Sequence, residues 1–237
     1  MLVPQGVAKQ LEVTADGKAL EYKQAHFISI LTHHIQSSYP SANAFNYKNI
    51  SSKYLKHHYT TDYFDSVITP LLDCELIEVD DSYSTELHFP KSYRLSNALI
   101  KGVIDGSTTI IYITSKPLIG NIEKWRRTTL SLQVKKYSFI EAEAIMLLHL
   151  NIDTSALEQL YEQRITDIKT SDKPNKKLAI INAIRNKEEI LQLTEAKDLL
   201  DARVRYIKGR VYHPFVQCPR EYRKAVVDDE GQPYVEV

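Results

Sequence analysis

The sequence contains few glycines, 7 in 237 residues, and only two cysteines. It lacks a GxGxxG fingerprint, a Walker loop and a GxSxG elbow, which excludes the sequence signatures of dinucleotide binding, P-loop nucleotide binding and α/β-hydrolase catalysis. The two cysteines, Cys74 and Cys218, have no CxxC spacing. Their arrangement excludes a cysteine-rich zinc site and a disulfide framework, and it favours a reducing compartment.

The sequence has no excess of positive or negative charge, and it contains no long apolar run. Its 30 Lys and Arg residues balance 30 Asp and Glu residues, so nucleic-acid binding has to come from local basic patches. No apolar run approaches the roughly 18 residues of a membrane helix, and the N-terminus does not have the pattern of a signal peptide. We therefore expect a cytoplasmic protein with no membrane partner.

Clusters of metal-ligating residues are scarce as well. The pairs His33-His34 and His57-His58 are adjacent in sequence, and neighbouring side chains on a helix project about 100° apart, so neither pair can readily share a metal ion. The acidic pairs Asp80-Asp81 and Asp228-Asp229 occur in turn contexts, where carboxylates usually cap or are solvated. We expect no metal or cofactor in this chain.

What the sequence does contain is the composition of a globular protein, with 43% hydrophobic and 25% charged residues. Its apolar periodicity predicts a mainly helical α+β fold in three parts. We expect an N-terminal extension over 1–19, a winged-helix-like domain over 20–97, and a mainly helical domain over 98–237 that ends in a basic loop and an incomplete strand.

The predicted domain over 20–97 begins with three helices and ends with two strands. The helices are expected over 19–37, from Ser51 or Ser52 to His58, and over 63–72, and the strands over 76–79 and 92–95. This order, with Leu71 to Val79 as the passage into a hairpin, resembles the winged helix-turn-helix family. The resemblance implies that the second helix of the pair lies in a major groove while the hairpin contacts the backbone.

The residues of this domain depart from that family in their charges. The expected reading helix, which begins Tyr63-Phe64-Asp65, carries an acid and no Lys or Arg. Basic residues lie instead on the preceding helix and on the hairpin, and we take four as candidate nucleic-acid contacts: Lys53, Lys56, His57 and Arg94. The alternative is a domain for packing or protein contact with a solvated Lys and His face.

The middle of the chain is predicted to be helical, apart from a connector over 97–106 and a strand over 108–114 that pairs with the hairpin or a later strand. A basic helix is expected over 121–136, with Trp125 either in the core or available for stacking. Further helices are expected after a capping box at Ser138, after an acidic cap at Asp153, and over 176–204.

The segment from 201 to 237 interleaves basic and aromatic residues, a composition typical of a surface for phosphates and stacked bases. Its candidate contacts are Arg205, Gly209, Arg210, Tyr212, Arg220 and Arg223. With the following acidic glycine turn and Tyr234-Val235-Glu236-Val237, it resembles the approach to the first catalytic motif of family A DNA polymerases. It is also similar to replication proteins of phages and mobile elements that join a winged-helix-like part to such a core.

That resemblance implies arginines that hold template, primer or triphosphate, and a metal-binding aspartate that would follow Val237. Magnesium is therefore expected only with a polymerase core beyond this chain, and we expect no catalysis from the chain alone. The hypothesis is a nucleic-acid-binding part of a replication protein, with DNA favoured over RNA. The alternatives are a non-enzymatic winged-helix regulator or replication initiator, and a protein-contact module.

Overall fold

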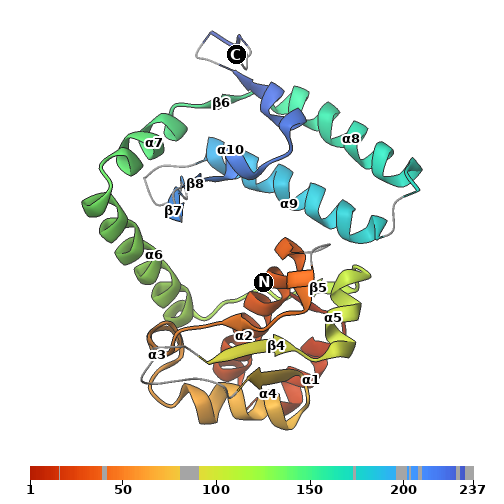
Figure 1. Ribbon diagram of the computed structural model, residues 1–237, viewed down its shortest axis with the longest axis vertical. Helices are drawn as coiled ribbons and strands as arrows, with labels where there is room; N and C mark the ends of the chain where they lie inside the picture. The colour runs from red at the N-terminus through yellow and green to blue at the C-terminus, as the bar shows by residue number, and fades with distance from the viewer. Residues whose placement is uncertain are drawn as a thin grey trace. The chain divides into compact units, whose positions relative to one another are not determined.

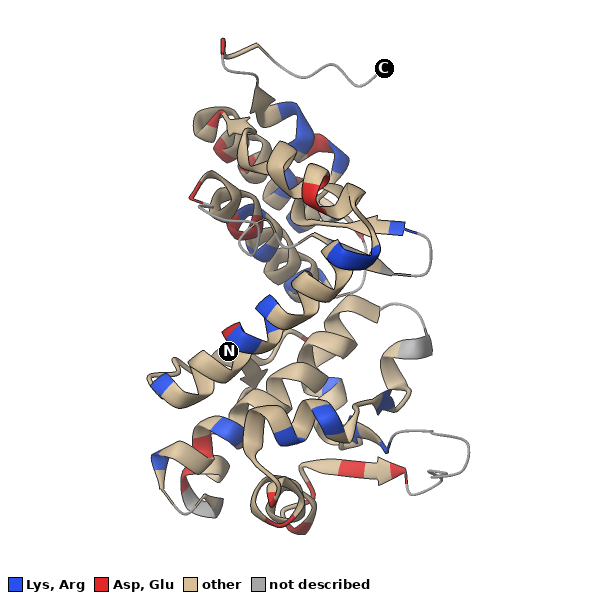
Figure 2. Cartoon of the chain, turned by 90° about the vertical axis from the view of Figure 1, so that its left-hand side faces the viewer, with Lys and Arg blue, Asp and Glu red and all other residues tan. Residues whose placement is uncertain are grey.

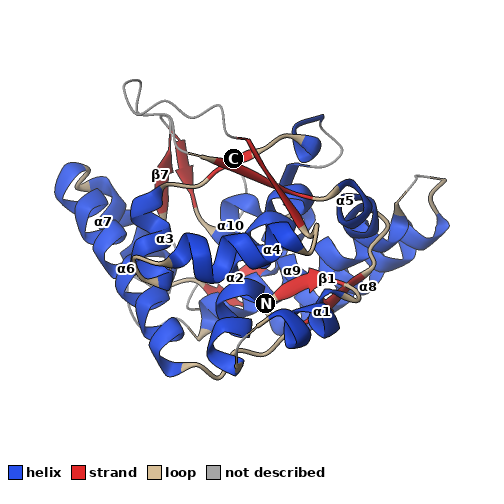
Figure 3. Ribbon diagram, turned by 90° about the horizontal axis from the view of Figure 1, so that it is seen from below, coloured by secondary structure: helices blue, strands red, loops and turns tan. Residues whose placement is uncertain are grey.

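The chain forms two compact units, Met1–Lys124 and Trp125–Val237, in a computed structural model (Figure 1). The structure describes residues 1–15, 17–38, 42–80, 91–172, 175–195, 202, 204–207, 210–227 and 230–232. Helices dominate and the strands are short (Figure 3). The predicted divisions after residues 19 and 97 differ from this unit boundary, because segments on both sides of 20–97 pack into the core of the first unit.

The N-terminal segment belongs to that core and is not an extension. Strand β1 (Leu2–Pro4) pairs antiparallel with β5 (Thr108–Ile110), and helix α1 (Val7–Thr14) follows it. The side chains of Val3, Val7 and Leu11 are fully buried. Strand β5 was expected to pair with the hairpin or a later strand, but its partner is the N-terminus.

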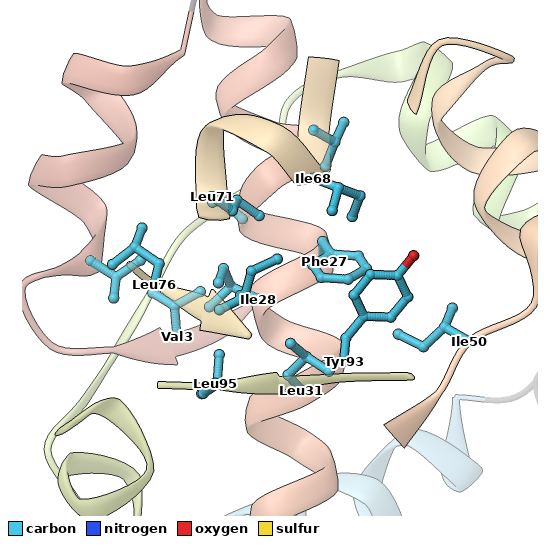
Figure 4. Close-up of a cluster of buried hydrophobic side chains, with 14 of the residues drawn as sticks. Val3, Phe27, Ile28, Leu31, Ile50, Ile68, Leu71, Leu76, Tyr93 and Leu95 are labelled. Atoms are coloured by element: carbon cyan, nitrogen blue, oxygen red, sulfur yellow. The ribbon is translucent and has the colours of Figure 1, made fainter. Parts of the chain in front are cut away.

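Helix α2 (Lys18–Ser38) is the centre of the first unit, and it confirms the helix predicted over 19–37. Phe27, Ile28 and Leu31 are almost completely buried, and Figure 4 shows them packed among side chains from several other elements. The ring of Phe27 meets that of Tyr93 edge-on, with centroids 5.2 Å apart. A short 3-10 turn, η1 (Ala42–Phe45), follows this helix.

After α2 come a short helix and then a second helical segment, in which the backbone hydrogen bonding changes just before Pro70. Helix α3 (Ser52–Tyr59) begins at Ser51, whose hydroxyl accepts from the Tyr54 amide at 3.2 Å. A π-helical segment, η2 (Phe64–Ile68), leads into α4 (Thr69–Asp73), and the Thr69 amide donates to the Phe64 carbonyl five residues earlier. Because proline has no N–H, the wider turn accommodates Pro70 without ending the helical segment.

Three short strands form an antiparallel sheet in the order β2-β4-β3. They are β2 (Lys48–Asn49), β3 (Ile77–Asp80) and β4 (Ser92–Leu95). Strands β3 and β4 correspond to the two predicted strands, whereas β2 was not predicted. Tyr93 and Leu95 alternate toward the core, as expected for successive positions of a strand. Residues 81–90, which connect β3 to β4, lie outside the described residues.

The expected connector over 97–106 is helix α5 (Asn97–Ile104), which buries Ile100 and Val103. Its apolar residues recur three and four positions apart, which suits one helical face. Helix α6 (Lys116–Lys136) begins five residues earlier than predicted and continues from the first unit into the second. Trp125 on this helix is only half-buried, so it does not belong to a closed core.

The second unit contains the helices α7 (Phe139–Leu148), α8 (Thr154–Thr170) and α9 (Lys176–Thr194). Helices α8 and α9 pack side by side (Figure 1). The predicted cap of α8 is confirmed, since Asp153 accepts from the Ala156 amide at 2.9 Å. The capping box at Ser138 is not formed, because Ser138 has helical φ and ψ and makes no capping hydrogen bond. Helix α9 ends at Thr194, short of the predicted 204.

The C-terminal segment is folded against these helices, so the predicted basic loop is largely regular structure. It contains the hairpin β7 (Arg205–Ile207) and β8 (Arg210–Tyr212), then α10 (Pro214–Gln217), η3 (Arg220–Ala225) and β9 (Val226–Val227). Strand β9 pairs with β6 (Asn151–Ile152). The buried residues Cys218, Tyr222 and Ala225 share a core with Leu157 of α8, which anchors the segment. The expected strand over 234–237 lies outside the described residues.

Candidate nucleic-acid interface

Helix α3 presents a basic face to solvent. Its eight residues include two lysines and two histidines and no acid. Leu55, His58 and Tyr59 are buried, and the helical period therefore places Lys53 and Lys56 on the opposite, exposed side. The two predicted lysines are thus available to a ligand, and Figure 2 shows where basic and acidic residues lie along the chain.

His57 holds α3 against the start of α6. Its Nε2 donates to the Asn121 carbonyl oxygen at 2.9 Å, and the Asn121 amide donates to the His58 carbonyl oxygen at 3.5 Å. His57 is one of the predicted nucleic-acid contacts, and in the structure its ring also links α3 to α6. Lys53 lies about one turn before His57, and Lys124 about one turn after Asn121, so two cations flank the helix contact.

A group of aromatic and imidazole rings supports the basic face from within. The His58 Nδ1 donates to the Tyr54 carbonyl oxygen at 2.8 Å, and its ring stacks on Tyr54 with centroids 3.9 Å apart. His26 and Tyr59 share a buried hydrogen bond of 2.8 Å. Burial lowers the pKa of His58 and raises the pKa of Tyr59 well above its usual value, which favours the neutral form of both rings.

Arg94, the candidate contact on β4, is paired within the protein. Its Nε and Nη2 donate to one carboxylate oxygen of Glu78, at 2.9 and 2.6 Å. The same oxygen accepts from the Tyr47 hydroxyl at 3.1 Å, and the guanidinium lies over the Tyr47 ring. The hydrogen bond with Glu78 raises the pKa of Arg94. This pairing balances the charge that a phosphate would otherwise encounter at this position.

The helical segment expected to read bases is on the acidic part of the first unit. Residues 61–80, which contain η2, α4 and β3, have no Lys or Arg and six acids: Asp62, Asp65, Asp73, Glu75, Glu78 and Asp80. Cations from other segments lie beside it: Arg94 pairs with Glu78, and the Lys91 Nζ lies 4.5 Å from the centroid of the Phe64 ring. Phosphates are therefore attracted to α3 and repelled from η2 and α4.

The candidate arginines of the second unit have different environments. Arg210 and Arg220 are exposed, and Tyr212 is half-buried. Arg223 instead contacts its own unit, since its Nη2 donates to the Val216 carbonyl oxygen at 3.1 Å and its guanidinium lies 5.9 Å from the Phe215 ring centroid. The side chain of Arg205 and the whole of Gly209 lie outside the described residues.

His213 helps to shape the same segment. Its Nδ1 accepts from the Val216 amide at 3.3 Å and caps α10. Burial, assisted by the charge of Arg223, lowers the pKa of His213 to about 4. The imidazole is therefore neutral near pH 7, which leaves the capping nitrogen free of a proton.

No protein-family model, curated protein or solved structure matches the chain. The assignment of the site consequently depends on the residues and their geometry. Within the described part of the chain, no group of three or more His, Cys, Asp or Glu residues could hold a metal ion. None of the described helices is long and apolar enough to cross a membrane.

The structure separates the predicted contacts into two sets. Lys53, Lys56 and His57 share one helix of the first unit, whereas the C-terminal candidates belong to the second unit. The sequence predicted a basic helix over 121–136, with Trp125 either in the core or available for stacking, and its cations were not included among the candidate contacts.

Proposed function

We propose that this protein binds nucleic acid through the phosphate backbone, with DNA as the preferred partner. The observation that carries the proposal is the charge separation in the first unit. Lys53 and Lys56 are exposed on a helix without acids, while residues 61–80 contain six acids and no Lys or Arg. In a chain with no net charge, such separation creates a local positive surface.

The order of elements in the first unit supports a winged-helix-like module within this proposal. Helix α2, the short strand β2, helix α3 and the segment η2–α4 precede the strands β3 and β4, and the last strand lies between the other two. A winged helix-turn-helix has an equivalent hairpin after its helices. The sheet order and the confirmed position of β4 favour this interpretation over an unrelated helical bundle.

The charges indicate how such a module would bind. Each lysine that neutralises a phosphate releases a condensed counterion, so affinity falls steeply with salt. Base edges are read only by side chains that enter a groove, and the helix expected to do so has Asp62 just before it and Asp65 in its first turn. Binding through α3 therefore depends on the backbone and discriminates little between sequences.

Fluorescence anisotropy with a labelled DNA duplex of mixed sequence tests this function on the full chain. We expect binding at low salt that weakens with added salt, and a Lys53→Ala, Lys56→Ala variant whose salt slope is smaller by about 2. A Lys9→Ala, Lys101→Ala variant is the control, because both lysines are exposed on other helices of the same unit. No binding at low salt, or equal binding by both variants, would contradict the proposal and leave the protein-contact module.

A second, narrower proposal is that the chain is the nucleic-acid-binding part of a phage or mobile-element replication protein. Its support is the resemblance of the C-terminal segment to the approach of family A polymerases, together with the exposure of Arg210 and Arg220 on that segment. This proposal assigns no catalytic step to the described residues. We expect preference for a primer–template over a plain duplex, lost in an Arg210→Ala, Arg220→Ala variant; equal affinity for both substrates would overturn it.

A further inference from the structure

Strand β5 has an open edge in the first unit. Among the described residues it pairs only with β1. The ladder continues one residue past the strand, since the Ile111 amide donates to the Met1 carbonyl oxygen at 2.8 Å and the Met1 ammonium donates to the Ile111 carbonyl oxygen at 2.6 Å. Hydrogen-bonding directions alternate along an antiparallel strand, so the backbone amides and carbonyls of Ile110 and Tyr112 point away from β1.

The side chains along this edge alternate between the core and solvent. Ile111 and Ile113 pack against the core of the first unit. Ile110 and Tyr112 face the other way, with 58% and 79% of their surfaces exposed. Two large apolar side chains therefore lie next to one another on the solvent face of an open edge. Apolar edges of this kind are where a sheet accepts a further strand.

The segment has none of the features that normally prevent such pairing. Residues 108–114 are six β-branched residues and one tyrosine, without a charge, a proline or a glycine. Natural edge strands are usually protected by lysine, by proline or by a bulge. The other edge of the sheet, on β1, contains Pro4, which has no N–H to donate. The edge of β5 is therefore the side of this sheet that can pair.

The segment is also symmetric about Ile111. Gly106, with a φ of 76°, ends it on one side, and Lys116, the first residue of α6, ends it on the other. If two copies pair antiparallel about Ile111, neither the turn nor the helix enters the ladder. Ile110 of each copy is then opposite Tyr112 of the other, in a hydrogen-bonded pair. Cross-strand pairs of an aromatic and a β-branched residue stabilise a sheet.

The charges at the two ends of the segment fit the same arrangement. Asp105 and Lys116 are both exposed, one at each end. Antiparallel pairing brings Asp105 of one copy to the end at which Lys116 of the other copy lies, so opposite charges meet at both ends. A parallel pair would place like charges together, which is unfavourable.

We propose that β5 is an interface between two copies of this chain, formed by antiparallel pairing of residues 108–114 about a two-fold axis at Ile111. The contact uses the same surface of both copies, so it closes with the dimer and leaves no edge for a third copy. One pair of strands buries less than the roughly 1,200 Å² of standard interfaces, and we therefore expect micromolar dissociation. The inference is independent of the proposed function, because no residue of α3 takes part.

Sedimentation velocity of the full chain tests the interface over concentrations from about 1 to 200 µM, the range of a weak dimer. The mass should rise from the 27.3 kDa of one chain toward twice that value. Ile110→Lys, Tyr112→Lys places like charges opposite one another and should weaken the dimer at least about tenfold. Ile110→Lys, Tyr112→Glu places opposite charges there, so its Kd should stay within about fivefold of wild type at low salt and rise with salt.

Phe45→Lys is the control for non-specific association, because Phe45 is another exposed apolar side chain of the same unit, with 47% of its surface exposed. It should dimerise like wild type. All of the changed side chains are exposed, so each variant should keep the wild-type circular dichroism spectrum.

Three results would overturn the inference. The first is a wild-type chain that stays monomeric up to about 200 µM or grows beyond two copies. The second is an equal weakening of the dimer by the two double variants, because only the proposed register places residue 110 opposite residue 112. The third is a loss for Phe45→Lys as large as that for Ile110→Lys, Tyr112→Lys.

Discussion

Arg94 and Glu78 are directly opposite one another on strands β4 and β3, and they form an ion pair across the sheet. The register of the antiparallel pair places their side chains on the same face, where Arg94 donates twice to one carboxylate oxygen. Tyr47 adds a third donor to the same oxygen. The contact therefore links the hairpin to the segment before β2 and partly neutralises the charge of Arg94.

Arg94→Ala is accordingly expected to affect stability more than binding. Loss of a partly buried, hydrogen-bonded pair should lower the free energy of unfolding by about 1 kcal/mol, while the Kd for duplex DNA changes by less than about twofold. Urea unfolding and anisotropy measure the two quantities. Lys53→Ala is the comparison, with the opposite pattern expected. A binding loss of tenfold or more for Arg94→Ala would show that the guanidinium contacts the ligand.

The N-terminal strand is predicted to be essential for the first unit. Val3→Asp places a charge in a fully buried position, and it should lower the free energy of unfolding by about 3 kcal/mol or more. Gln5→Asp is the control, because Gln5 is exposed two residues further along the chain. Urea denaturation followed by circular dichroism compares them, and equal stability of the two variants would be evidence against the β1–β5 pairing.

His213 should make the second unit sensitive to acid. Its pKa falls from the ordinary 6.5 to about 4 on folding, so the unfolded chain takes up a proton before the folded one does. Stability from this residue is therefore complete above about pH 6.5 and declines, by up to about 3 kcal/mol, as the pH falls to 4.

The variant His213→Asn tests this dependence, because asparagine can still accept from the Val216 amide but does not titrate. Its unfolding free energy should vary less between pH 6.5 and 4 than that of wild type. His149→Asn, which changes an exposed histidine at the end of α7, should keep the wild-type dependence. Identical pH profiles for His213→Asn and wild type would refute the assignment.

Replacing Arg223 should lower the free energy of unfolding more than replacing Arg220, although the two residues are only three positions apart. Arg223→Ala removes the hydrogen bond to Val216 and the contact with Phe215, and should cost about 1–2 kcal/mol of unfolding free energy. Arg220→Ala changes an exposed side chain and should cost about 0.5 kcal/mol or less. Chemical denaturation of both variants measures these changes. Similar losses of unfolding free energy in the two variants would show that Arg223 has no special structural role.

The local sequence was sufficient for several elements. The apolar spacing of α2 and the cap of α8 at Asp153 are found as predicted, and the cap of α3 is Ser51, one of the two serines that the sequence offered. Each depends on residues within one or two turns of one another, and such interactions are specified by short-range periodicity and side-chain hydrogen bonding. The exposure of Lys53 and Lys56 followed from the same periodicity, once Leu55 was assigned to the core.

Tertiary structure alone decided which of the other candidate residues are available to a ligand. The partner of β5 is more than a hundred residues earlier in the chain, and no local pattern encodes so distant a pairing. Arg94 and Arg223 are both basic residues among aromatics in the sequence, yet one pairs with Glu78 and the other with the Val216 carbonyl. Charge is a property of the residue, but its availability depends on the groups that folding places beside it.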